Sequence, residues 1–181
     1  MTTFYIRGQE RLVDRNVGIY LLTQLTALGW FNVDAPFGAT GPITLVDQVP
    51  ARHTELVPNT MAFTSGPVQK DTELELGAAG GGLWVTEHVY FCDIFGESVG
   101  VADALAADVR AILTGRLSGT SRYQPLTDYS LPTPVVAVGH VIHFEDVETE
   151  TLPTETYKRA WRVVKMTACH EYNAVETGGG P

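Results

Sequence analysis

The chain is poor in cysteine, in basic residues and in long apolar runs. Its 181 residues include two cysteines, Cys92 and Cys169, and neither belongs to a CxxC pair. The first ten residues, MTTFYIRGQE, mix polar and apolar side chains and do not resemble a secretory signal. The longest apolar runs are far too short to span a membrane. We therefore expect a soluble cytoplasmic protein with two free thiols, no disulfide and no membrane contact.

Basic residues are outnumbered, with 12 Lys and Arg against 21 Asp and Glu and a formal net charge of −9. They are also scattered, and Lys158 and Arg159 are the one adjacent pair. A surface that grips nucleic acid needs clustered Lys and Arg to contact phosphates. The composition therefore argues against a protein that holds DNA or RNA tightly. The apolar content of 44% nevertheless allows a sizeable core.

Residues 83–115 have the clearest secondary-structure pattern in the chain. Apolar and polar residues alternate up to Gly96, which predicts a half-buried strand. Ser98 can then cap a helix whose apolar residues recur at helical spacing, and Gly115 stands where a left-handed residue ends a helix. A helix this close to its strand must fold back over the sheet. We expect the core to contain Val89, Phe91, Val101, Leu105, Val109 and Ile112.

The remaining segments have weaker patterns. A helical pattern runs from Glu10 to Leu28 and stops at Gly29. The glycine run Gly77–Gly82 leads into a strand and has no following Lys-Ser or Lys-Thr pair, which excludes a phosphate loop and favours a turn. Residues 116–134 and 145–156 are polar and predict a connection and a loop. The other expected strands cover residues 43–46, 60–64, 73–76, 135–147 and 156–172.

These segments predict the fold class. Strands come in runs instead of alternating with helices, which is typical of α+β proteins. We expect one domain over residues 1–181, with an extended loop region at 47–82 and a flexible tail at 173–181. Its architecture should be a mixed or mostly antiparallel sheet of about five to six strands, with two main helices packed on one face.

Histidine and cysteine residues give little reason to expect a metal. His140 and His143 are three apart on a predicted strand, so they point to opposite faces, and Cys169 and His170 are separated in the same way because they are adjacent. His88 and Cys92 could share a face with His140 or His170 if their strands pair. Four ligands would then have to converge on that face. We expect no metal and no cofactor.

Patterns typical of enzymes are also weak. Ser65-Gly66 and Ser118-Gly119 lack the strand–turn–helix context of a catalytic serine. Cys92 lies in mid-strand, where a thiol is usually a small buried apolar group. The carboxylate pairs Glu73/Glu75 and Glu148/Glu150 suit solvated faces better than an acid–base pair. We expect a protein that is not an enzyme.

Residues 83–115, together with the order of the other elements, resemble one known protein family. The segment EHVYFCDIFG at 87–96, the helix at 102–113, the leading helix and the closing strands follow one order. This pattern resembles the tail terminator, or tail completion, proteins of long-tailed bacteriophages of the siphophage type. The resemblance implies no catalytic residues. It implies a homo-oligomeric ring, usually a hexamer, at the head-proximal end of the tail tube, where it stops tube polymerisation and offers a surface to the head.

The resemblance also implies partners and a location. The partners are other copies of the chain, the tail-tube protein and a head–tail connector or stopper protein, while DNA passes through the lumen without specific binding. The protein would be part of the virion and would assemble in the host cytoplasm. We expect contacts with a neighbouring subunit or the tube through residues 47–82, with Glu73, Glu75, Gly80, Gly81 and Gly82 among them. Another neck or connector protein, or a small soluble enzyme, are the alternatives.

Overall fold

The structure, a computed structural model, describes residues 6–31, 43–46, 49, 59–76, 82–128, 133–153 and 158–174. Two helices and six strands lie in these ranges. Along the chain they are α1 (Ile6–Ala27), β1 (Thr44–Val46), β2 (Thr60–Leu76), β3 (Gly82–Gly96), α2 (Val99–Leu113), β4 (Tyr123–Asp128), β5 (Val135–Leu152) and β6 (Ala160–Ala174).

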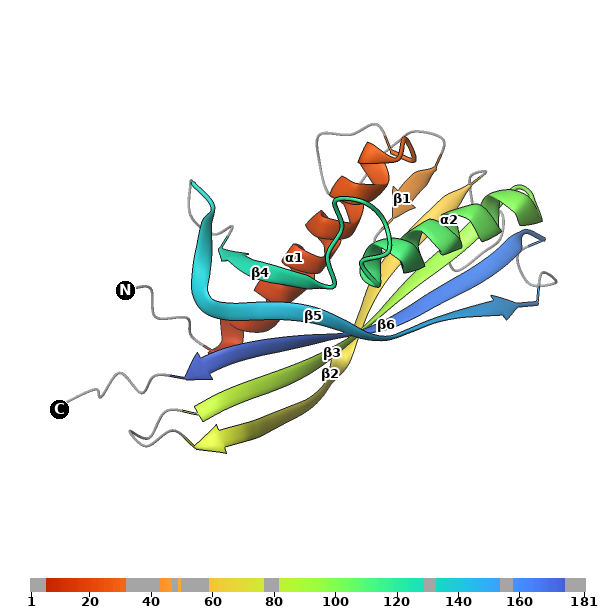
Figure 1. The fold of residues 1–181 in the computed structure, drawn as a ribbon. Helices are drawn as coiled ribbons and strands as arrows, with labels where there is room; N and C mark the ends of the chain where they lie inside the picture. Colours follow the sequence, from red (N-terminus) through yellow and green to blue (C-terminus); the bar gives the residue numbers. More distant parts are fainter. Residues whose placement is uncertain are drawn as a thin grey trace.

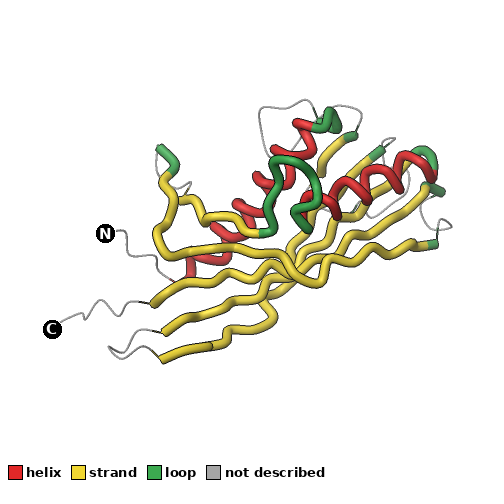
Figure 2. Tube along the Cα trace, viewed as in Figure 1, coloured by secondary structure: helices red, strands yellow, loops and turns green. Residues whose placement is uncertain are grey.

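The six strands form one twisted sheet in the order β1-β2-β3-β6-β5-β4. β1 and β2 are parallel, and every other neighbouring pair is antiparallel. Both helices lie on the same side of this sheet, as Figures 1 and 2 show. The fold is therefore α+β with a mixed six-stranded sheet, as the sequence predicted. No helix in the described ranges combines the length and apolar character needed to cross a membrane.

The junction between β3 and α2 explains why the sequence of residues 83–115 predicts a strand, a turn and a helix. A Cβ atom at Gly96 would lie 2.7 Å from the Ser98 carbonyl oxygen and 2.9 Å from Ala102, so only glycine fits this turn. The Ser98 side chain accepts a hydrogen bond from the Val101 amide at 3.3 Å and caps α2. Gly115, at φ 66°, follows the last turn in the left-handed conformation.

The core lies between the sheet and the helices, but it uses the other face of β3. Tyr90, Cys92 and Ile94 point into the core cluster, while Val89 is buried outside that cluster and Phe91 is partly exposed. The prediction placed Val89 and Phe91 on the core side because Tyr90 and its neighbours looked polar. The Tyr90 hydroxyl finds a partner, Asp14, in the helix layer, which offsets the cost of burying it. The α2 residues Leu105, Val109 and Ile112 are fully buried, and Val101 is partly buried against them.

Helix α1 covers the core where it packs against β2 and β4. Its register places Asp14 beside Tyr90, whose hydroxyl donates to Oδ1 at 2.6 Å. Burial, and then the Asp14 carboxylate, raise the pKa of Tyr90, so this phenol stays protonated. The helix ends at Ala27, and Gly29 follows in the left-handed conformation with a φ of 85°. The Trp30 indole then donates to Oδ2 of Asp108 at 2.8 Å and ties the end of α1 to α2.

The structure corrects the predictions for three parts of the sheet: the segment that forms β2, the segment that contains β4, and the end of β5. Residues 60–64 and 73–76 belong to one strand, β2, because bulges opposite β3 absorb the irregular stretch after Ser65. The loop region expected at 47–82 therefore contains the whole of this long strand, and the expected connection at 116–134 contains β4. The acidic stretch after Glu145 continues as strand to Leu152. Residues 47–48, 50–58, 77–81 and 175–181 lie outside the described ranges.

Candidate functional site

Two long strand edges have no strand beside them in the described part of the chain. β1 pairs only with residues 60–62 of β2, which leaves the β2 edge, residues 63–76, open. β4 pairs with β5 only between Val135 and His143, which leaves the β5 edge, residues 145–152, open. These edges lie on opposite sides of the sheet. Unpaired N–H and C=O groups along such edges are templates for another strand.

The outer edge of β4, in contrast, is blocked within the chain. The Asn16 side chain on α1 donates to the Thr127 carbonyl at 2.9 Å and accepts from the Thr127 amide at 2.8 Å. The amide therefore satisfies the β4 backbone as a neighbouring strand would. The β4 edge is therefore capped at Thr127 by a buried side chain, whereas the β2 and β5 edges have no strand paired with them in the described ranges.

An apolar arm extends from the sheet on the side where β4 and β5 lie. We define the arm as β4 together with residues 135–141 of β5. β6 pairs with β5 only from His140 onward, and Gly139, with a φ of 79°, lies where β5 turns away from the sheet (Figure 1). Among the described residues, most exposed large hydrophobic side chains belong to the arm, and Val138 is 95% exposed. They are Tyr123, Val135, Val136, Val138 and Val141.

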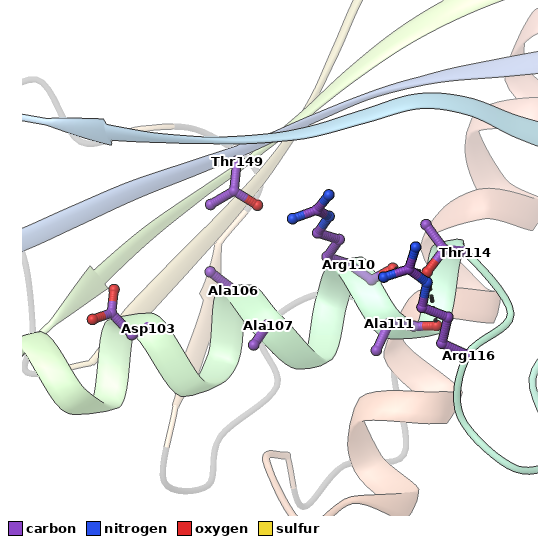
Figure 3. Close-up of a pocket in the computed structure, with 8 residues that line it drawn as sticks. All are labelled: Asp103, Ala106, Ala107, Arg110, Ala111, Thr114, Arg116 and Thr149. Carbon is purple, nitrogen blue, oxygen red and sulfur yellow. Dashed lines mark hydrogen bonds between the residues drawn. The ribbon is translucent and has the colours of Figure 1, made fainter.

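Two hollows flank the β5 edge. One has a volume of about 360 Å³ and lies between α2 and Thr149, with Ala106, Ala107 and Ala111 among its lining residues (Figure 3). The other, of about 480 Å³, shares Arg110 and Thr149 with the first. Its further lining residues are Phe91, Val147, Glu148, Glu150, Val163 and Lys165. Side chains of a paired strand alternate between two faces, so hollows on both sides of the edge could accept them.

The side chains lining these hollows suit binding better than catalysis. In the described ranges they offer the basic groups of Arg110, Arg116 and Lys165, three carboxylates and hydroxyl groups, but no histidine or cysteine. The carboxylates belong to Asp103, Glu148 and Glu150. A nucleophile beside a general base is the arrangement that nucleophilic catalysis requires. Mixed charges around a floor of small residues are instead suited to a protein partner that packs closely.

Histidine residues gather on the helix-facing side of the sheet, as the sequence allowed. Nδ1 of His140 lies 3.0 Å from Nε2 of His170, so one ring donates and the other accepts. Both rings stack on Tyr172, with centroid distances of 5.6 and 5.0 Å. Burial lowers the pKa of His140, and burial followed by the neighbouring His140 and His88 lowers that of His170 to about 3. This cluster is therefore neutral and internally bonded at neutral pH.

The opposite face holds a second cluster that sequence reasoning missed. His143 on β5 stands directly opposite Cys169 on β6, and Glu145 follows on the same face. Cys92 lies on the helix-facing side, so the two free, buried cysteines are on opposite faces. Only the β5–β6 register brings His143 and Cys169 together, and no local pattern reveals that register.

The contact residues expected from the sequence fall partly on the β2 edge. Glu73 and Glu75 lie on it, opposite Trp84 and Leu83 of β3, and Gly82 begins β3. Gly80 and Gly81 lie outside the described ranges. The arm and the β5 edge were not anticipated. One signal could have pointed to the arm, because adjacent valines at 135 and 136 put apolar groups on both faces of a strand.

Comparison with known proteins identifies no relative, since no protein-family model matches the chain and no curated protein matches its sequence. The assignment of a function therefore rests on the residues and the fold. The resemblance of residues 87–113 to tail terminators stays a prediction.

Proposed function

We propose that this protein is a structural subunit that closes into a ring, and that the ring is a tail terminator of a long-tailed phage. The observation that carries the ring is the pair of open edges on opposite sides of one sheet. The tail-terminator assignment rests on the resemblance of residues 87–96 and 102–113. Its role would be to end tube polymerisation and to present a surface for head attachment.

Pairing between the β5 edge of one copy and the β2 edge of the next would satisfy both edges at once. The two surfaces differ, so the contact is heterologous, and repeated contacts of this type close into a ring when the rotation per subunit divides a full turn. Closure leaves neither of these two long edges unpaired, which also protects the protein from uncontrolled aggregation. A hexamer is the number that the resemblance implies.

The arm and the hollows support such a contact. Exposed valines concentrated on one projection are typical of surfaces that another protein covers. The hollows beside Thr149 could hold the alternating side chains of a docked strand. Residues 63–76 would supply that strand, with Glu73 and Glu75 on it. They lie within the segment 47–82, which the sequence analysis expected to make such contacts.

The charge of the chain is compatible with a conduit for DNA. With a net charge of −9, repeated around a ring, the subunits would present few groups that bind phosphates. DNA would pass through the lumen without being held. A ring built to grip DNA would require clustered basic residues, and the chain has few of them.

The ring is tested by native mass spectrometry and negative-stain imaging, with and without purified tail tubes. Thr149→Lys on the β5 edge and Ser65→Lys on the β2 edge place charge on exposed positions and should abolish rings without lowering Tm. Thr23→Lys, an exposed change on α1, is the matched control and should leave rings intact. Rings that persist in both edge variants would refute edge pairing.

The tail-terminator role is tested separately. Purified protein is added to polymerising tail-tube protein or to head-connector protein, and tube length and complex formation are measured. We expect shorter, uniform tubes with a ring at one end. Binding to the head connector alone, with tube length unchanged, would reject the terminator role in favour of another neck protein.

A further inference from the structure

The face of the sheet opposite the helices brings together three different metal-binding groups. The ligand atoms of His143, Glu145 and Cys169 all lie within 4.8 Å of one another. They come from neighbouring strands whose register pairs His143 with Cys169, and Glu145 is two residues further along the same face. Because strand backbones hold them, the three groups are positioned before any ligand binds.

The His143 ring is buried with part of its hydrogen-bonding capacity unused. Its side chain is only 10% exposed. Nε2 lies 3.1 Å from Oε1 of Glu145. Nδ1 lies 3.2 Å from Oε1 of Glu171, but this contact lacks hydrogen-bond geometry, and Nδ1 is buried without a hydrogen-bond partner among the described residues. Buried polar atoms without partners are uncommon in native proteins and call for an explanation such as a bound ion.

The charges around Cys169 favour a cation. Four carboxylates, those of Glu145, Glu87, Glu171 and Asp146, act electrostatically on the Cys169 thiol. One positive group is also present, because Nη2 of Arg122 lies 3.5 Å from Oε1 of Glu145. The Arg122 side chain, whose Nε donates to the Phe144 carbonyl at 2.8 Å, is 47% exposed, so solvent screens its charge. Carboxylates therefore outnumber cations at this site.

We propose that His143, Glu145 and Cys169 form a binding site for a divalent transition-metal ion of the zinc type. Imidazole, thiolate and carboxylate are the ligands that Zn²⁺ takes in proteins, and the thiolate selects against Mg²⁺ and Ca²⁺. On binding, the Cys169 S–H bond breaks, its proton passes to solvent and the sulfur coordinates the ion. Three protein ligands leave a fourth position for water. The observations for this site do not rest on ring formation, although Glu145 is also the first residue of the open β5 edge. A bound ion would link β5 to β6 beside the arm.

The test titrates purified wild-type protein, freed of metal by chelation, with Co²⁺ and then with competing Zn²⁺. We expect one Co²⁺ per chain, a thiolate-to-cobalt charge-transfer band in the near ultraviolet, and loss of that band when Zn²⁺ displaces Co²⁺. Cys169→Ala should remove the band, and His143→Gln and Glu145→Gln should each weaken Co²⁺ binding by about tenfold or more. Circular dichroism verifies that each variant is folded.

Cys92→Ala is the matched control because it removes the other buried thiol, which lies on the opposite face. The control should keep the band at full intensity. The proposal is overturned if wild-type protein shows no band at millimolar Co²⁺, if the band survives in Cys169→Ala, or if Cys92→Ala abolishes it. Should Cys169→Ala not fold, a band absent from folded His143→Gln supports the site, and an undiminished band there rejects it.

Discussion

The β3–α2 unit and the arm are both apolar in sequence, but they have opposite fates in the structure. Leu105, Val109 and Ile112 of α2 are fully buried, whereas Val136 and Val138 of the arm are 52% and 95% exposed. Their burial differs because different structural layers cover the two segments. α2 lies directly on the sheet (Figure 1), while the arm leaves the sheet and is covered by α1 on one side only.

This contrast supports the proposal that a partner covers the arm. Leu126 and Ala137 of the arm are buried, so the arm already supplies its share of the core. Its exposed valines are therefore additional apolar surface, which the described part of the chain leaves open to solvent. Apolar residues without a covering layer in their own chain are typical of assembly surfaces. The following predictions test the contrast and are ordered by their expected effect on the free energy of unfolding.

Leu105→Asp should have the largest effect. The substitution places a charge without a described partner under the sheet, where Leu105 is 0% exposed, and should cost about 4 kcal/mol or more. We expect loss of the cooperative thermal transition. Ala104→Asp, its exposed neighbour on α2, should leave Tm nearly unchanged. A soluble Leu105→Asp variant with the wild-type Tm would show that this helix is not packed as described.

Gly96→Ala should destabilise the β3–α2 junction by about 2–3 kcal/mol, because the added Cβ would overlap backbone atoms of Ser98 and Ala102. Urea unfolding measures the change. Gly100→Ala is the matched control, since Ser98 Oγ at 4.0 Å is the nearest atom its Cβ would meet, and it should be neutral or stabilising by up to about 1 kcal/mol. Equal effects of the two substitutions would contradict the tight turn.

Asn16→Ala should cost about 1–2 kcal/mol, because the Thr127 amide and carbonyl lose their side-chain partner. It also opens the edge of β4. Chemical denaturation gives the first effect, and light scattering at rising concentration should detect new association through the second. Thr23→Ala, at an exposed position on the same helix, should produce neither.

Val138→Asp should have the smallest effect on folding and a large effect on assembly. A side chain that is 95% exposed contributes little to the isolated subunit, so the free energy of unfolding should change by less than about 0.5 kcal/mol. Ring formation should fall sharply in native mass spectrometry. Val99→Asp, at a 56% exposed valine on α2, is the control. Unchanged ring yield in Val138→Asp would remove the arm from the interface.

Much of the fold was predictable wherever neighbouring residues carry the information. Ser98, Gly29 and Gly115 mark helix ends through their own backbone and hydroxyl chemistry, and the structure has them in those roles. The runs of strand pattern predicted an α+β fold. In contrast, the Ser-Gly-Pro stretch inside β2 looked like a turn, and the bulges opposite β3 that accommodate it are invisible in a local window.

The candidate sites were much less predictable. Opposite faces of β3 have the same period, so alternation alone could not tell that Tyr90 and not Phe91 meets the helices; the partner of the Tyr90 hydroxyl, Asp14, is 76 residues away. The open edges depend on which strands end early, and that is known only once the sheet is assembled.

The sequence by itself determined the turns, the helix stripes and the acidic, apolar-rich character of the chain, because each depends on residues a few positions apart. Tertiary structure alone decided which strand edges stay open, which valines remain uncovered, and that His143 stands opposite Cys169. Those features follow from register and layer packing between distant segments, and a shift of one residue in register would reverse them.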